Sequence, residues 1–232
     1  MASLSKQPYI TPTVAVDYAT LANLTEADGW NELAPGQVLE MGLGWDKSTG
    51  GSGGLLGWVN KKAGSDLDGV ATFYVGDRPV KYLGWDELDT FADEGNAAGS
   101  AVHTGDNQTG EGGGDDETIR LALGNIPVRI TSIMLNATAF KHGSSMRRAK
   151  NIKVTLYDST GGTKEPVAWI EPSLLNPKNT IGVAVLRRKR DDSGAIVPGA
   201  WQLKVLDRSV DVTQGNRDDF LIRTAQLMQQ AQ

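Results

Sequence analysis

The segment 105–117 reads GDNQTGEGGGDDE and combines five acidic residues with five glycines. Carboxylates crowded this closely repel one another unless a cation lies between them. Calcium prefers about six to eight oxygen ligands from carboxylates, side-chain amides and backbone carbonyls, and this loop offers all three kinds. Its glycines permit the tight turns that let several oxygens converge. Because the spacing differs from that of an EF-hand, we expect a calcium loop of another kind, with a solvated acidic loop as the alternative.

A second acidic pair, Asp66 and Asp68, flanks Leu67 at the expected start of a strand. Side chains alternate across a strand, so both carboxylates should point to the same side. Two carboxylate sets at the ends of elements are what a paired metal site needs. We therefore expect calcium as the cofactor, with two ions bound.

The composition excludes several other kinds of site. The chain has no cysteine, so disulfides, thiolate metal sites and cysteine nucleophiles are ruled out. It has only two histidines, His103 and His142, which makes a multi-histidine metal site unexpected. The formal net charge of −5 argues against nucleic acid as a partner. No apolar stretch is long enough to span a bilayer, and the N-terminus MASLSKQPYITP lacks the apolar core of a secretory signal. We therefore expect a cytoplasmic protein without membrane insertion.

The remaining motifs do not predict catalysis. His142, Ser144 and Ser145 lie close together, but no partner acid is placed near them and no nucleophile elbow surrounds them. The glycine runs lack the lysine of a phosphate-binding loop. The basic run 187–190 has no interleaved aromatic residues and is expected to be a solvated hairpin tip. His103, two residues before the acidic loop, is expected to be an ordinary loop residue. We expect no enzyme activity and no small-molecule substrate.

Short apolar runs with a period of two recur along the chain and predict strands. Polar turns separate these runs, which is typical of an antiparallel sandwich. We therefore expect a mainly β fold, an antiparallel two-sheet β-sandwich with acidic loops. The apolar residues expected to share a face within four of the runs are Ile119, Leu121 and Leu123; Ile152, Val154 and Leu156; Ile181, Val183 and Val185; and Trp201, Leu203 and Val205.

Two segments depart from this simple alternation. In residues 128–139 the apolar phase slips between Ile130 and Ile133, which indicates a bulge or burial on both faces. In residues 218–231 the apolar residues recur at helical spacing, with Asp218 as the expected N-cap. The apolar stripe of this C-terminal helix must be covered, either by the protein's own sheet or by a neighbouring subunit.

Four motifs, in this order along the chain, resemble those of the TerD (tellurite-resistance) family: Ser3–Lys6 (SLSK), Gly42–Asp46 (GLGWD), Asp66–Asp68 (DLD) and Gly105–Glu117. The resemblance implies a two-sheet β-sandwich that binds calcium through its acidic loops and has no enzymatic activity. Carried over position by position, it implies a ligand set of Asp66, Asp68, Asp106, Asn107, Asp115, Asp116 and Glu117. Asp46 is a weaker candidate.

The sequence also departs from the family pattern. Residues 7–33 look inserted, Ser65 stands where the family usually has phenylalanine, and the stretch 76–100 is longer than expected. The final helix has no obvious family counterpart. We divide the chain into an N-terminal arm with an insertion at 1–35, a TerD-like sandwich at 36–210 and a helical tail at 211–232.

Two functions remain open at this point. The first is a calcium-binding stress module of the tellurite-resistance type, whose cation-ordered loops dock protein partners. The second is a structural subunit of a large assembly, such as a bacteriophage virion component assembled in the host cytoplasm. In the second case the inserted arm at 7–33 would lie extended along a neighbour. Both lead us to expect protein partners, through self-association or a larger assembly.

Overall fold

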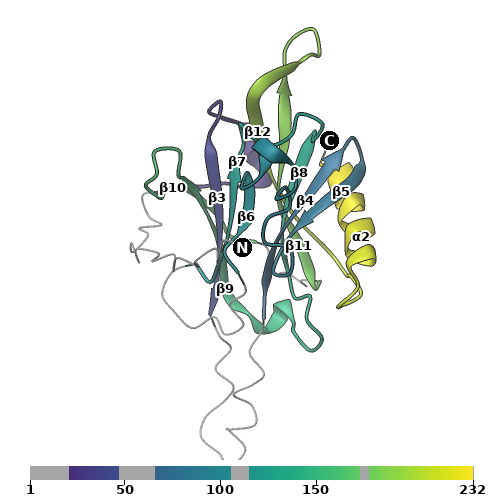
Figure 1. The fold of residues 1–232 in the computed structure, drawn as a ribbon. Helices are drawn as coiled ribbons and strands as arrows, with labels where there is room; N and C mark the ends of the chain where they lie inside the picture. Colours follow the sequence, from purple (N-terminus) through teal and green to yellow (C-terminus); the bar gives the residue numbers. More distant parts are fainter. Residues whose placement is uncertain (1–20, 47–65, 106–114, 173–177, 232) are drawn as a thin grey trace, which may run out of the picture.

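The computed structural model describes residues 21–46, 66–105, 115–172 and 178–231, apart from the side chains of Asp46, Arg148 and Lys150. The described residues form two six-stranded sheets packed face to face (Figure 1). All strand pairs are antiparallel except β1 with β10. The expected mainly β, two-sheet sandwich is therefore confirmed.

The first sheet carries the strands that flank the acidic loop. In spatial order its strands are β1 (Ala22–Asn23), β10 (Glu165–Ile170), β9 (Lys150–Asp158), β3 (Val38–Asp46), β7 (Glu117–Ala122) and β6 (Ala101–His103). Its central strand β3 alternates as expected for a sheet with one buried face. Leu39, Met41 and Leu43 enter the main core, while Glu40 lies on the opposite, outer face.

The second sheet is covered on both faces. In spatial order its strands are β2 (Asn31–Leu33), β12 (Ile196–Val210), β11 (Thr180–Arg190), β8 (Ser132–Thr138), β4 (Asp68–Val75) and β5 (Arg78–Leu83). Every residue of β8 is buried. Ile133 and Leu135 join the main core between the sheets, whereas Met134 packs in a separate cluster beneath the C-terminal helix. Burial on both faces is thus the reason for the apolar phase slip.

One expected set of face-sharing residues is wrong. Ile181 and Val183 point into the main core, but Val185 belongs to the cluster under the helix. The register of β11 shifts between Gly182 and Ala184 against both of its neighbours. Such a bulge reverses the alternation beyond it, so Val185 faces away from the core.

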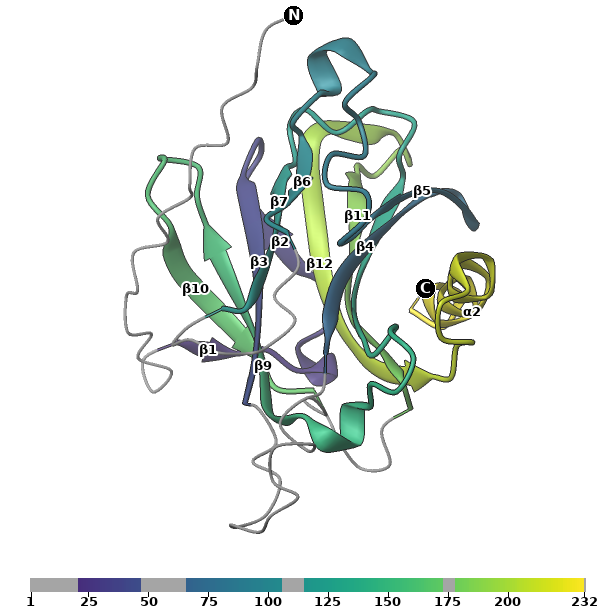
Figure 2. The same ribbon diagram turned by 60° about the horizontal axis from the view of Figure 1, so that its bottom comes forward.

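The C-terminal helix α2 (Arg217–Gln229) forms a third layer on the outer face of the second sheet (Figure 2). Its N-cap is Asn216, whose side chain accepts from the backbone N–H of Asp219, so the expectation of Asp218 as N-cap is wrong. Phe220 packs against Tyr82 and Phe140, with ring centroids 6.1 and 6.0 Å away. The helix therefore covers the protein's own sheet. No helix within the described ranges combines the length and the apolar character needed to cross a membrane.

Residues 84–100 connect β5 of the second sheet to β6 of the first and, together with β6, close one side of the sandwich. Phe91 is fully buried and meets the edge of Phe73 at a centroid distance of 5.1 Å. The N–H of His103 donates to the carbonyl of Leu88, and Asp89 bridges to Val102. The longer stretch expected at 76–100 thus contains strand β5 and contributes Phe91 to the hydrophobic core.

Residues 22–33 close the opposite side. Strand β1 pairs with β10 of the first sheet, and β2 pairs with β12 of the second. A short 3-10 helix between them (Glu26–Asp28) is tied to β12, because Arg208 donates to Glu26 at 2.8 Å. The guanidinium of Arg187 stacks 3.7 Å from the ring centroid of Trp30. The described part of the N-terminal arm therefore belongs to the protein's own sandwich rather than extending along a neighbour.

Candidate metal centre

The two acidic clusters come together at one end of the sandwich. Asp66 and Asp68 lead into β4 of the second sheet, and residues 115–117 lead into β7 of the first. The N–H of Gly69 donates to Oε2 of Glu117 at 2.6 Å across the space between the sheets. The start of β4 is therefore joined directly to the start of β7. Asp106 and Asn107 lie outside the described residues.

Glu117 is buried between the sheets, with 1% of its surface exposed. Nε2 of the equally buried His103 lies 3.4 Å from its Oε2, longer than an ideal hydrogen bond. Nδ1 of His103 accepts from the N–H of Gly105 at 3.0 Å, so a neutral imidazole carries its proton on Nε2, toward the carboxylate. His103 is thus the inner wall of the site rather than a loop residue. The signal for this was its alternation with Ala101, but the strand is only three residues long.

Asp66 and Asp68 are both buried, at 5% and 4% exposure. Nζ of Lys141 donates to Oδ2 of Asp66 at 3.1 Å. The other oxygen of Asp66, Oδ1, is buried and accepts no hydrogen bond from the described residues. Burying a carboxylate oxygen without a partner is costly, so this atom is suited to a cation ligand. Burial raises the pKa of Tyr82, and the carboxylates of Asp86 and Asp68 raise it further.

Asp115 lies apart from Glu117, on the outer face of the first sheet. Its carboxylate accepts from Nζ of Lys164 at 2.8 Å, and that ammonium sits 4.0 Å from the ring centroid of Tyr157. The carboxylate rests on Gly42, where an added Cβ would come within 2.1 Å of the Asp115 Cγ. Asp115 is therefore paired with a lysine that sequence reasoning missed, because the two residues are 49 positions apart.

Similarity to known proteins agrees with this architecture. The family model described as the TerD domain matches residues 32–191, more than half of the chain. The chain belongs to the TerD family.

Several relatives share part of this TerD sequence. The tellurium resistance protein TerZ of Serratia marcescens is 32% identical over 126 residues, covering 53% of this chain and 60% of that protein. TerD of Serratia marcescens is 33% identical over 108 residues, covering 47% of this chain and 49% of that protein. The stress response protein SCP2 of Bacillus subtilis is 33% identical over 96 residues, covering 41% of this chain and 47% of that protein. The chain thus spans between about half and three-fifths of the length of these relatives.

The fold agrees as well. The crystal structure of a TerD homologue from Streptomyces coelicolor superposes with a TM-score of 0.57 at 18% identity. The superposition covers 80% of this chain and 95% of that one. At this identity the likeness shows the fold alone.

The residues of the TerD motif at 42–46 contact the C-terminal end of the acidic loop in this chain. Gly42 leaves room for the Asp115 carboxylate, as described above. The N–H of Trp45 donates to Oδ2 of Asp116 at 3.0 Å, and the N–H of Asp116 donates to the carbonyl of Leu43 at 2.8 Å. The motif therefore anchors the C-terminal end of the acidic loop to β3.

The described members of the predicted TerD ligand set lie in four places. Asp66 and Asp68 lie at the start of β4, Glu117 lies between the sheets, Asp115 lies on the outer face of the first sheet, and Asp116 binds the backbone of β3. In the ranges that the structure describes, no three acidic or histidine side chains group closely enough to hold a metal ion. Asp66 and Asp68 are the described pair that best fits a partial calcium site.

Proposed function

We propose that this TerD domain is a non-catalytic calcium-binding module, with Asp66 just before β4 and Asp68 at its first position as ligands. The observation that carries the proposal is the buried Oδ1 of Asp66, which accepts no hydrogen bond from the described residues. A hard cation satisfies such an oxygen and removes the repulsion between the two carboxylates. Asp106 and Asn107, which belong to the acidic loop 105–117, remain proposed ligands on the basis of the family resemblance.

Calcium at this position would stabilise the junction between the sheets. Asp68 precedes Gly69, whose N–H binds Glu117 of the opposite sheet. A ligand that binds only the folded state stabilises it by about 2.7 kcal/mol at a hundredfold excess over its Kd. Magnesium should bind more weakly, because it requires a smaller octahedral shell. A cation-ordered end of the sandwich is then the surface on which a protein partner would dock.

Titration calorimetry after chelation tests the site. Adding calcium should release or absorb heat, and Asp66→Asn should weaken the affinity at least tenfold, about 1.4 kcal/mol. Asp192→Asn is the matched control, because Asp192 is exposed at the hairpin between β11 and β12 and forms none of the contacts described here. The absence of a calcium-specific signal in the wild-type chain would reject the proposal. An unchanged affinity in Asp66→Asn would place the site elsewhere.

The relatives' names support a role of the same general kind, in tellurium resistance or stress response. The alternative of a virion subunit rested on the inserted arm and the C-terminal helix. Residues 22–33 and α2 both pack on the protein's own sheets, so they no longer favour that alternative.

A further inference from the structure

Several polar groups on the outer face of the first sheet converge on the ammonium of Lys164, which lies in the loop between β9 and β10. Its Nζ donates to Oδ2 of Asp115 at 2.8 Å and to Oγ1 of Thr118 at 3.5 Å. It also lies 3.7 Å from Oε2 of Glu40 and 4.0 Å from the ring centroid of Tyr157. One positive charge is therefore surrounded by two carboxylates, a hydroxyl and the face of a ring.

This arrangement is sheltered from solvent. The side chains of Asp115, Glu40 and Lys164 are 7%, 12% and 20% exposed. Partly buried charges are screened by salt much less than exposed ones. The ammonium thus acts as a fixed cation at this place on the sheet.

The charges around Lys164 are already balanced. Nε of Arg120 lies 3.8 Å from Oε1 of Glu40, so two cationic side chains face the carboxylates of Glu40 and Asp115. A calcium ion on Asp115 would share that carboxylate with an ammonium 2.8 Å away, and like charges so close repel strongly where solvent is partly excluded. The buried Oδ1 of Asp66, by contrast, accepts no hydrogen bond from the described residues. Asp66 therefore suits a calcium ion, and Asp115 does not.

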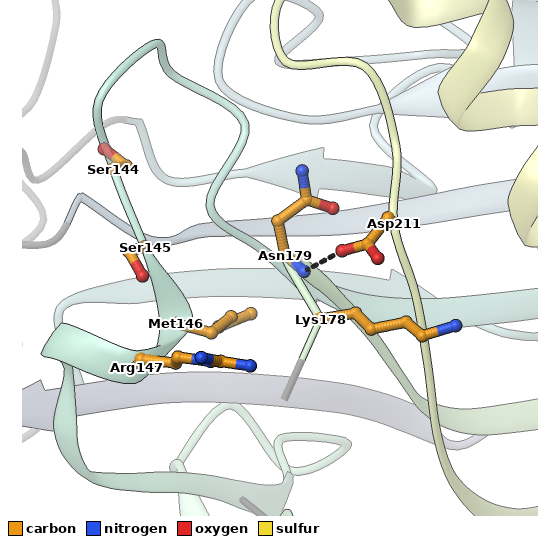
Figure 3. A pocket seen from close by; sticks show the side chains of 7 residues that line it. All are labelled: Ser144, Ser145, Met146, Arg147, Lys178, Asn179 and Asp211. Carbon is orange, nitrogen blue, oxygen red and sulfur yellow. Dashed lines mark hydrogen bonds between the residues drawn. The ribbon is translucent and has the colours of Figure 1, made fainter. Parts of the chain in front are cut away.

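A hollow elsewhere in the molecule shows what such convergence excludes. It has a volume of about 220 Å³, and its lining includes Arg147, Lys178 and Asp211. Figure 3 shows that the charged ends of these three side chains do not meet at a common point. Charged residues that merely line one hollow do not form a cation site, whereas the groups around Lys164 share one centre.

We propose that the ammonium of Lys164 takes the place of the second calcium ion expected from the family resemblance. The chain then binds one ion, at Asp66 and Asp68, and the inference rests on the proposed calcium function for that ion alone. A lysine ammonium is a compact charge with three donors, which suits the two carboxylates and the hydroxyl around it. Asp115 is consequently held on the sheet at every calcium concentration, and only the cluster at the start of β4 responds to the metal.

Titration calorimetry of the chelated full chain counts the calcium ions. The wild-type chain should bind one, and Asp115→Asn should change neither this number nor the affinity. Lys164→Ala removes the ammonium and leaves its space open, so this variant should bind one ion more than the wild-type chain. Adding Asp115→Asn to Lys164→Ala should remove the extra ion.

Lys204→Ala is the matched control, because it changes the net charge equally. Lys204 lies over the ring of Trp30 and forms no ion pair with a described residue, so its loss should add no ion. The proposal is overturned if Asp115→Asn loses an ion or at least tenfold in affinity, or if Lys164→Ala binds no more ions than the wild type or Lys204→Ala. If Lys164→Ala fails to fold, Asp115→Asn decides alone. A wild-type chain that binds no calcium would refute the calcium proposal, yet Lys164→Ala should then still bind one ion, so the two failures are distinguishable.

Discussion

Replacing Phe220 by alanine should destabilise the whole domain, because α2 is part of its core rather than an appendage. The ring is 1% exposed and meets Tyr82 and Phe140 edge-on. Truncating a buried phenylalanine costs about 3–5 kcal/mol through lost transfer free energy and the cavity left behind. In a chain of this size that loss lowers the melting temperature by about 6–20 °C. Thermal unfolding followed by circular dichroism measures it.

Ile222→Ala provides the control on the same helix. Ile222 is 59% exposed, and alanine has a better helix propensity, so its melting temperature should change by no more than about 2 °C. The measurement should be repeated across protein concentrations. If Phe220→Ala melts like the wild-type chain, or if its deficit disappears as the protein associates, the helix is covered by a neighbour and our reasoning is refuted.

Three further variants test the packing and the site. The buried guanidinium of Arg188 donates to the carbonyls of three residues in the loop before β8. Arg188→Ala should therefore lower the free energy of unfolding, measured in denaturant, by at least about 2 kcal/mol. Arg190→Ala is the control, because Arg190 is exposed at the hairpin and its loss should change this free energy little. Lys164→Met leaves the carboxylate of Asp115 without its lysine and should lower the free energy of unfolding by about 1–3 kcal/mol. Adding Asp115→Asn to this variant should restore part of the loss. If the losses of the two single variants simply add in the double variant, the pair is not coupled. Burial raises the pKa of Tyr74 from 10.0 to about 12, so its neutral form stabilises the fold below pH 10 and that contribution, at most about 3 kcal/mol, is lost as pH rises through about 12. Tyr74→Phe should flatten this alkaline loss, and an unchanged pH profile would contradict the assignment.

The long strands and the helix could be predicted from the sequence because their periods are long enough to be seen. Apolar residues alternate over 152–156 in β9 and over 201–205 in β12, and α2 shows helical spacing over 13 residues. Strands β1 and β2 have two and three residues, so no alternation can reveal them. Their pairing depends on neighbours more than 100 positions away in the sequence.

The candidate site was predictable as a set of residue types but not as an arrangement. Motif spacing pointed to both acidic clusters, and the bond from Gly69 to Glu117 brings them together. The spacing of the motifs could not show that Lys164 holds Asp115 on the outer face of the first sheet, or that His103 lines the interior. Those contacts depend on which way each side chain leaves its strand, and the tertiary fold decides that.

The closure of both sides of the sandwich bears on how this protein can aggregate. An open, long, flat edge strand is a template on which other chains add strands. Here the outermost strands β1, β2 and β6 have only two or three residues, and the longer β5 carries Pro79 and Lys81. Proline removes one backbone donor, and lysine opposes the approach of another chain. Association by strand addition at these described edges is therefore disfavoured.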